Sequence, residues 1–112
     1  MENMERPELK GALWPDDQAE ILYKGKIKVK GKDKYVSLVR SKMPNGDPVC
    51  ELVVSLGRVY ENYLRPGGKN HDKEPDIGGP ITIDGVVYRF GSWFNTDAKG
   101  EAFLGASLRE EK

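Results

Sequence analysis

The sequence predicts an all-β fold, a small antiparallel barrel or sandwich of about six strands built from two related three-stranded meanders. Apolar and polar residues alternate with period two from Ile21 onward, clusters of turn-forming residues separate the runs, and one glycine-bounded motif occurs in both halves. The length of 112 residues suits one domain, 1–112. We divide it into a first three-stranded unit (9–56), a connecting loop with a short helical turn (57–78) and a second three-stranded unit (79–109).

The first unit is expected to hold three strands. In residues 24–30 lysines alternate with Gly25, Ile27 and Val29, which is typical of a half-buried strand with a basic outer face. Residues 31–34 are expected to turn the chain into a second strand at 35–40, and the turn formers of 43–48 lead into a third at 49–56. The third run is almost continuously apolar, so we expect burial on both faces, with Cys50 packed as a small hydrophobe.

The second unit follows a stretch with mixed signals. Helical spacing of apolar residues predicts one or two helical turns within 58–64, and the glycines of 67–79 predict a loop that contains His71. Asp-Gly at positions 84–85, between alternating apolar residues, predicts a tight two-residue hairpin joining strands at 81–83 and 86–94. A polar turn at 95–100 and a last strand at 102–108 complete the unit.

The two units resemble one another in sequence. One motif, in which glycines enclose two β-branched residues at alternate positions, occurs in both: Gly25, Ile27, Val29 and Gly31, then Gly79, Ile81, Ile83 and Gly85. Gly46 and Gly100 then open the third strand of each unit. We interpret the match as a duplicated meander. The alternative is a chance alignment of the glycine turns that any all-β chain contains.

Charge is distributed unevenly along the chain. The formal net charge of +0 argues against a histone-like or purely electrostatic binder of nucleic acid. Residues 24–42 nevertheless carry eight basic residues against one acidic residue, Asp33, so the rest of the chain is acidic by the same amount. We therefore expect a polarised protein with one strongly basic segment.

The sequence carries no signal for a membrane or for secretion. No apolar run approaches the roughly 18 residues that span a bilayer. Residues 1–10 are charged and lack the apolar core of a signal peptide, and we expect residues 1–8 to be a frayed terminus. A single cysteine can form no internal disulfide, which fits a reducing compartment. These features predict a cytoplasmic protein without a membrane partner.

The residue inventory argues against an enzyme and against a bound cofactor. One cysteine and one histidine in different segments cannot supply a usual zinc site or a nucleophile with its base. Residues 66–69 (Pro-Gly-Gly-Lys) lack the spacing and the following Ser or Thr of a phosphate-binding loop. Asp72, Glu74 and Asp76 supply too few oxygen ligands for a calcium loop, so we expect solvated carboxylates there.

Two features qualify as binding candidates. Strict alternation places Lys24, Lys26, Lys28 and Lys30 on one face at intervals of about 6 to 7 Å, close to the spacing of phosphates in an extended single strand. The alternative is an edge strand whose lysines prevent pairing with other chains.

The second feature is an aromatic strand. Alternation from the 84–85 turn places Ile81, Ile83, Val86, Tyr88 and Phe90 on the inner face. It places Arg89 and Trp93 together on the outer face, where an exposed indole beside a guanidinium would form a base-stacking platform. A bulge at Gly91 would reverse this register and bury Trp93 instead.

Several short motifs carry a resemblance to a protein class. They are Gly11-Ala12-Leu13-Trp14, Glu74-Pro75-Asp76, Ile81-Thr82-Ile83-Asp84-Gly85-x-x-Tyr88, Trp93, and Lys99-Gly100-x-x-Phe103-Leu104-x-x-Ser107-Leu108. Over about forty residues of the second half, the chain resembles small uncharacterised phage and plasmid proteins with an OB-like β-barrel, similar to single-stranded DNA-binding proteins. The resemblance implies a location in the host cytoplasm if the protein is phage-encoded. The basic first unit is absent from the shorter relatives, so its role is our inference.

These observations predict a non-enzymatic binder of single-stranded DNA or RNA, with cations along the backbone and aromatics under the bases. The predicted nucleic-acid-binding residues are Lys24, Lys26, Lys28, Lys30, Lys32, Lys34, Tyr35, Arg40, Lys42, Arg89, Trp93 and Phe94. The alternative is a phage-type interaction module or inhibitor that docks on an acidic surface of a host protein, and a carbohydrate-binding or virion role is a third reading. The sequence leaves open whether the protein is a monomer or a homodimer.

Overall fold

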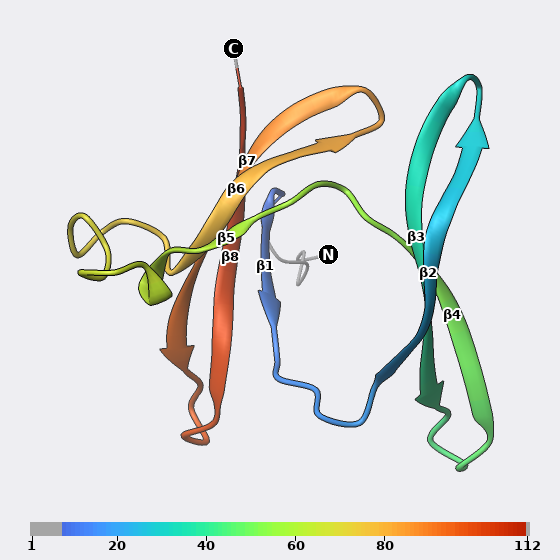
Figure 1. Ribbon diagram of the computed structural model, residues 1–112. Coiled ribbons are helices and arrows are strands. Elements are labelled where there is room, and N and C mark those ends of the chain that lie inside the picture. Colours follow the sequence, from blue (N-terminus) through green and yellow to red (C-terminus); the bar gives the residue numbers. More distant parts are fainter. Residues whose placement is uncertain (1–7, 112) are drawn as a thin grey trace, which may run out of the picture. The chain divides into compact units, whose positions relative to one another are not determined.

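The computed structural model describes residues 8–111, apart from the side chain of Lys42, and residues 1–7 with their expected frayed terminus lie outside the description. Within the described part, all regular structure is antiparallel β except one short 3-10 helix (Figure 1). The elements are β1 (Lys10–Leu13), β2 (Glu20–Val29), β3 (Lys32–Lys42), β4 (Pro48–Val54), β5 (Tyr60–Glu61), η1 (Asn62–Leu64), β6 (Ile77–Ile83), β7 (Val86–Thr96) and β8 (Ala102–Glu110). The predicted all-β class is confirmed.

The strands form two open sheets, and each sheet belongs to its own compact unit. The three-stranded unit, Asp16–Leu56, has the order β2-β3-β4. The five-stranded unit contains, of the described residues, 8–15 and 57–111, and its order is β1-β8-β7-β6-β5. Of the two predicted architectures, barrel or sandwich, the barrel alternative is excluded, because the described ladders end at β1 and β5 in one sheet and at β2 and β4 in the other.

Each sheet contains one of the two expected meanders. The β2-β3-β4 and β6-β7-β8 meanders match at a constant offset of 54 residues, since β3 begins at Lys32 and β7 at Val86. Both first hairpins turn through two residues of positive φ, Lys30 (52°) and Gly31 (81°) in one, Asp84 (52°) and Gly85 (82°) in the other. The expected turn at 31–34 is therefore displaced, because positive φ at Lys30 closes the hairpin one residue earlier.

The second hairpins also correspond. In one, the Gly46 N–H donates to the Met43 carbonyl and the Met43 N–H to the Asp47 carbonyl. In the other, the Gly100 N–H donates to the Asp97 carbonyl and the Asp97 N–H to the Glu101 carbonyl. Gly46 and Gly100 both have positive φ, which explains why each third strand follows a glycine. The repeat seen in the sequence is thus a repeat of turn geometry.

Two short strands extend the second meander into five strands. β1 pairs with β8, with Lys10 opposite Ser107 and Leu13 opposite Leu104, so residues 10–13 belong with the second meander and not with the first. β5 pairs with β6 through Tyr60 opposite Gly78. The helical turns expected at 58–64 reduce to η1, because Tyr60 and Glu61 are extended and paired with β6.

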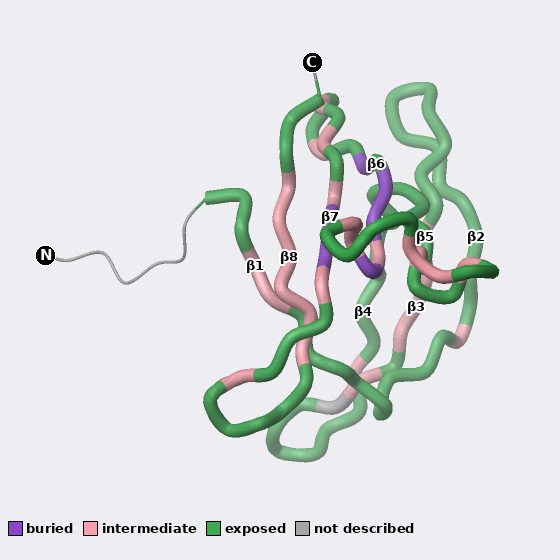
Figure 2. The backbone as a smooth tube through the Cα atoms, turned by 90° about the vertical axis from the view of Figure 1, so that its left-hand side faces the viewer, coloured by how far each residue is buried: buried purple, intermediate pink, exposed green. Residues whose placement is uncertain are grey.

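Burial is concentrated in the five-stranded unit. The buried residues lie at the start of β6, in its middle and in the centre of β7 (Figure 2). Among the described residues Ile81 is the one buried hydrophobic side chain, and Asp76 and Ser92 are buried polar residues. The expectation that β4 is covered on both faces is wrong, because it is an edge strand, and Cys50, Leu52 and Val54 are exposed.

Candidate nucleic-acid interface

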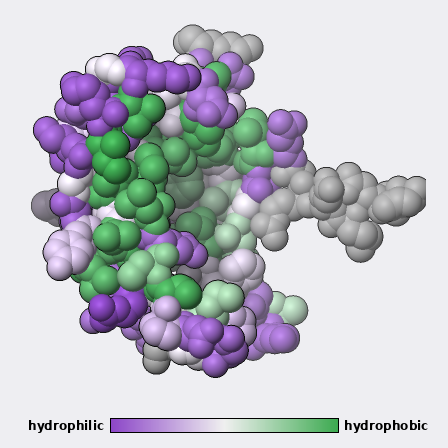
Figure 3. Space-filling model, turned by 90° about the vertical axis from the view of Figure 1, so that its right-hand side faces the viewer, coloured by the Kyte–Doolittle hydropathy of each residue, from purple (hydrophilic) through white to green (hydrophobic). Residues whose placement is uncertain are grey.

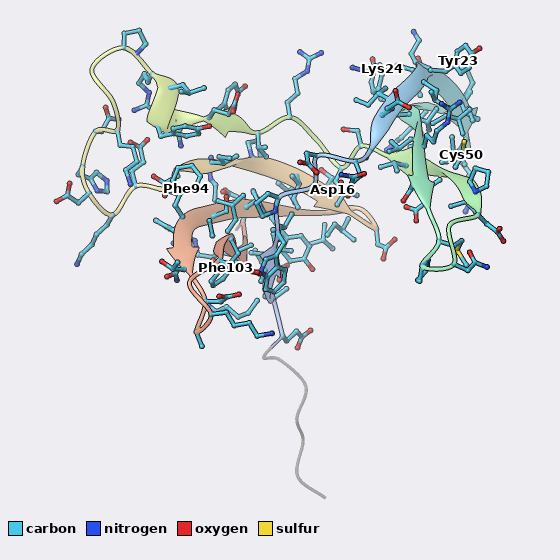
Figure 4. All side chains as sticks on the ribbon, turned by 90° about the horizontal axis from the view of Figure 1, so that it is seen from below. Asp16, Tyr23, Lys24, Cys50, Phe94 and Phe103 are labelled. Atoms are coloured by element: carbon cyan, nitrogen blue, oxygen red, sulfur yellow. The ribbon has the colours of Figure 1, made fainter. Side chains whose placement is uncertain are left out.

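The three-stranded unit presents a row of lysines on one face of the β2-β3 hairpin. Lys24 lies opposite Ser37, Lys26 opposite Tyr35, and Lys28 opposite Asp33, and directly paired residues of antiparallel strands point to the same face. We call these six residues the lysine face. All three lysines and Tyr35 are exposed, with 61% of Tyr35 accessible to solvent. The face therefore combines evenly spaced cations with one open aromatic ring, and Lys24 is marked in Figure 4.

The charges of this face are only loosely held. Asp33 lies 3.7 Å from Lys26 Nζ and 3.7 Å from Lys28 Nζ, and all three side chains are at least 41% exposed. Exposed ion pairs of this length contribute about 0 to 1 kcal/mol. A phosphate can therefore displace the Asp33 carboxylate at little cost.

The other predicted cations of this segment do not join the row. Lys30 is in the turn, which moves Lys32 and Lys34 to the opposite face of the sheet, opposite Val29 and Ile27. Arg40 lies on that same opposite face and pairs with Glu20 at 3.2 Å. The side chain of Lys42 lies outside the description. Of the four lysines expected on one face of β2, three are there, and Lys30 is not.

The edge-strand alternative has structural support as well. β2 is an outer strand of its sheet, and lysines on an outer strand discourage pairing with other chains. Apolar residues on the opposite face of this sheet are exposed, including Tyr23 (73%), Leu52 (56%) and Val54 (47%). Figure 3 shows hydrophobic residues at the surface beside hydrophilic ones. Edge protection and ligand binding are compatible uses of the same lysines.

The five-stranded unit presents an arginine face. Arg89 lies directly opposite Arg109, in register with Pro80 on β6, and the next row of this face is Tyr60, Gly78, Gly91 and Ser107. The β6-β7-β8 register is continuous through Gly91, so no bulge reverses the strand. The predicted alternation is therefore confirmed, with Arg89 and Trp93 on one face and Tyr88 and Phe90 on the other.

Trp93 is not the open stacking platform that an exposed indole would provide. A Cβ on Gly91 would lie 3.0 Å from Trp93 Cη2 and 3.2 Å from Pro75 Cγ, so the ring packs above the glycine and beside the proline. The indole Nε1–H donates to the Lys73 carbonyl at 3.1 Å. The loop before β6 therefore half-buries Trp93, although its strand faces the expected way.

Phe94 points away from Arg89 and Trp93. It lies on the opposite face of β7, opposite Leu104, and is 54% exposed. Its ring meets Tyr63 edge to face at 4.8 Å between centroids. Figure 4 labels Phe94, and also Phe103, whose ring stacks on Trp14 at 5.4 Å. Phe94 therefore cannot share a ligand with Arg89 on one face of the sheet.

Two charged pairs join residues within the loop 65–76, and a hydrogen bond from β7 ties the loop to this sheet. Arg65 binds the Glu74 carboxylate through both terminal nitrogens at 2.9 and 3.2 Å, and the Asn70 N–H also donates to it. Lys69 Nζ lies 2.9 Å from Asp76 Oδ1, while the Phe94 N–H donates to Oδ2 at 2.8 Å. Glu74 and Asp76 are thus bound by the protein's own cations and amides, whereas solvated carboxylates were expected.

These contacts change the acidity of both carboxyl groups. The hydrogen bond from Arg65, followed by that from the Asn70 amide, lowers the pKa of Glu74 to about 2. The Phe94 amide and then Lys69 lower the pKa of Asp76 against the opposing effect of burial. Both groups are therefore charged at neutral pH, and the loop is held electrostatically.

The lysine face and the arginine face occupy equivalent positions in the two meanders. At the offset of 54 residues, Tyr35 corresponds to Arg89, Ser37 to Gly91 and Lys26 to Pro80. Tyr60 and Arg109 of the arginine face were not among the predicted site residues. The position of Arg109 could be predicted from the β7-β8 register. The position of Tyr60 could not, because β5 has only two residues and no local sequence pattern predicts it.

No protein-family model, curated protein or solved structure matches the chain. The resemblance to phage and plasmid OB-like proteins therefore stays a prediction. Within residues 8–111, no helix is long and apolar enough to cross a bilayer, and no three His, Cys, Asp or Glu side chains gather in a way that could hold a metal ion.

Proposed function

We propose that the protein is a non-enzymatic binder of single-stranded nucleic acid and that the lysine face is its main contact. The observation that carries the proposal is the cross-strand pair of Lys26 and the exposed Tyr35, flanked by Lys24 and Lys28. Proteins that bind single strands without sequence preference use cations that contact the phosphate backbone and aromatic rings that stack on the bases.

The spacing of the face supports the same reading. Side chains two positions apart on one strand are separated by about 6 to 7 Å, comparable to successive phosphates of an extended strand. Three lysines can neutralise three phosphates, and Tyr35 lies in the central row. Stacking of one base on an aromatic ring contributes about 1 to 3 kcal/mol.

The direct test compares two double substitutions that remove the same charge from opposite faces. Fluorescence anisotropy with a labelled single strand of about 12 nucleotides measures affinity at about 50 and 200 mM salt. Lys26→Gln/Lys28→Gln should weaken binding about tenfold, and should reduce the salt slope by about 1.4, at about 0.7 per phosphate contact. The matched control, Lys32→Gln/Lys34→Gln, should retain most of the affinity.

A second pair tests the aromatic contact. Tyr35→Phe keeps the ring and should bind like the native protein, whereas Tyr35→Leu should lose about 1 to 3 kcal/mol of binding free energy. The proposal would be wrong if the two double lysine variants lost the same affinity, or if the native protein bound no oligonucleotide at the lower salt concentration.

The second candidate is a protein-interaction module that uses the same cations against an acidic host surface. Exposed apolar residues of the three-stranded unit favour it, because a purely electrostatic nucleic-acid binder has no need of Leu52 and Val54 at the surface, although these two lie on the face opposite the lysine face. Co-purification from nuclease-treated host lysate separates the candidates. A protein that is retained after nuclease treatment, and is lost from the Lys26→Gln/Lys28→Gln variant, would support this candidate.

A further inference from the structure

The arginine face contains a recess that the sequence did not suggest. It has a volume of about 490 Å³ and lies entirely within the five-stranded unit, between β5, the loop before β6, and the β7-β8 pair. Its lining includes Tyr60, Arg65, Glu74, Arg89 and Arg109 around the backbone of Gly78 and Gly79. Gly78, which pairs with Tyr60, has no side chain to fill the recess, and Pro75 packs beside it as part of the lining.

The charges around the recess favour an anion. Arg65 is neutralised by its two hydrogen bonds to Glu74. Arg89 pairs with Glu111 at 3.3 Å, but both side chains are more than 40% exposed, so this contact is easily exchanged. Arg109 makes no ion pair within the described residues and lies directly opposite Arg89. Two like charges in direct cross-strand register repel one another, and an anion between them relieves that repulsion.

Tyr60 supplies an aromatic wall to the same recess. Tyr60 is 62% exposed although its backbone is paired with Gly78. A Cβ on Gly79 would lie 3.4 Å from Tyr60 Cδ2 and 3.1 Å from the Arg58 carbonyl oxygen, so a glycine there lets the chain of β5 approach closely. Guanidinium groups and an open phenol ring therefore border one nucleotide-sized space.

We infer that this recess binds the phosphate and base of one nucleotide, with the phosphate between Arg89 and Arg109 and the base against Tyr60. The site is separate from the lysine face, and it rests on the proposed function for the source of its nucleotide. The chemistry that it recognises is a nucleoside 5′-phosphate, either free or at the end of a strand. A terminal phosphate fits better than an internal one, because a monoester offers more oxygens to two guanidinium groups.

The test titrates the full-length protein with thymidine 5′-monophosphate, followed by NMR amide shifts or calorimetry. Thymidine and inorganic phosphate are titrated separately, and both should bind more weakly than the nucleotide.

Arg109→Gln should weaken nucleotide binding about tenfold, which corresponds to one lost charge-assisted contact. Arg58→Gln is the matched control, because Arg58 is in the same unit but does not line the recess. Tyr60→Phe should retain binding, whereas Tyr60→Leu should weaken it.

Two oligonucleotides, identical except for a 5′-phosphate or a 5′-hydroxyl, distinguish a strand end from a free nucleotide. A 5′-phosphate preference that Arg109→Gln abolishes assigns the site to strand ends, and nucleotide binding without that preference assigns it to free nucleotides. Equal affinities of Arg109→Gln and Arg58→Gln for the nucleotide, or a nucleotide bound no better than phosphate, would overturn the inference.

Failure of the inference differs from failure of the proposed function. If oligonucleotides bind through Lys26 and Lys28 but the nucleotide does not bind, only the recess assignment is lost. If the nucleotide binds and the Lys26→Gln/Lys28→Gln variant retains full oligonucleotide affinity, the proposed role of the lysine face is wrong and the recess assignment stands.

Discussion

The two meanders have corresponding turns and equal central strands, yet they are stabilised in different ways. The β6-β7-β8 meander gains a strand on each side and a loop closed by Arg65–Glu74 and Lys69–Asp76, and all the buried residues described belong to this five-stranded unit. The β2-β3-β4 meander has no added strand, and the ion pairs among its described residues are exposed. One backbone plan can therefore serve as a rigid scaffold in one unit and as an exposed charged surface in the other.

The largest expected difference concerns a carboxylate in each unit. Asp76→Ala should lower the free energy of unfolding by about 1 to 3 kcal/mol, because the part-buried Phe94 N–H and the Lys69 ammonium lose their acceptor. Asp33→Ala in the other unit should change it by less than about 1 kcal/mol. Urea denaturation followed by tryptophan fluorescence reports the five-stranded unit, which contains both Trp14 and Trp93, and circular dichroism reports both units. Equal effects of the two substitutions would contradict the contrast.

The second-largest expected effect is a loss of stability of the five-stranded unit at acid pH. The folded pKa of Glu74, about 2, lies below its ordinary value of 4.5. Its contribution to stability is therefore fully present above about pH 4.5 and is lost as the pH falls towards 2. Urea midpoints from tryptophan fluorescence should fall across this window. Glu74→Gln should be less stable at neutral pH and should converge on the native protein near pH 2, and a constant difference at all pH values would count against the Arg65–Glu74 contact.

A smaller effect comes from Gly91 and Ser37, which occupy equivalent positions in the two meanders. Gly91→Ala places a methyl group 3.0 Å from the Trp93 ring and 3.2 Å from Pro75, which should cost about 1 kcal/mol and shift tryptophan emission as the indole moves. Ser37→Ala in the other meander should leave stability within about 0.5 kcal/mol. Unchanged emission in Gly91→Ala would show that Trp93 does not pack on that glycine.

The smallest effect compares the two hairpin turns. Lys30 and Asp84 both have a φ of 52°, a conformation that Asp and Asn tolerate better than Lys. Lys30→Asn should stabilise its hairpin by about 0.5 kcal/mol, and Asp84→Asn should gain less. Hydrogen exchange of the β2-β3 and β6-β7 amides measures each hairpin by itself. A larger gain at Asp84 would break the equivalence of the two turns.

Much of the fold followed from local signals. Alternation identified the six long strands, and the 84–85 turn fixed the face of every side chain in β7, including Arg89 and Trp93. The recurring glycines predicted a repeat that both hairpins of each meander share. A turn depends on the conformations of a few adjacent residues, so those residues alone can encode it.

The candidate site was less predictable because its parts depend on register and on distant contacts. The hairpin turns at Lys30 and Gly31, which places Lys32 and Lys34 on the face opposite the lysine face. A shift of one residue in the turn moves each following side chain to the other face of the sheet. Trp93 has the predicted direction, but Pro75 and the Lys73 carbonyl half-bury it. No pattern within β7 could indicate a loop that lies about twenty residues earlier.

The sequence by itself determined the strands, the turns and the repeated plan, because period-two patterning and glycine conformations act over short distances. Only the tertiary structure decided that β1 joins β8, that Tyr60 borders Arg89 and Arg109, and that two ion pairs hold the loop before β6. Those contacts join residues far apart in the chain, and their geometry exists only once the sheet has formed.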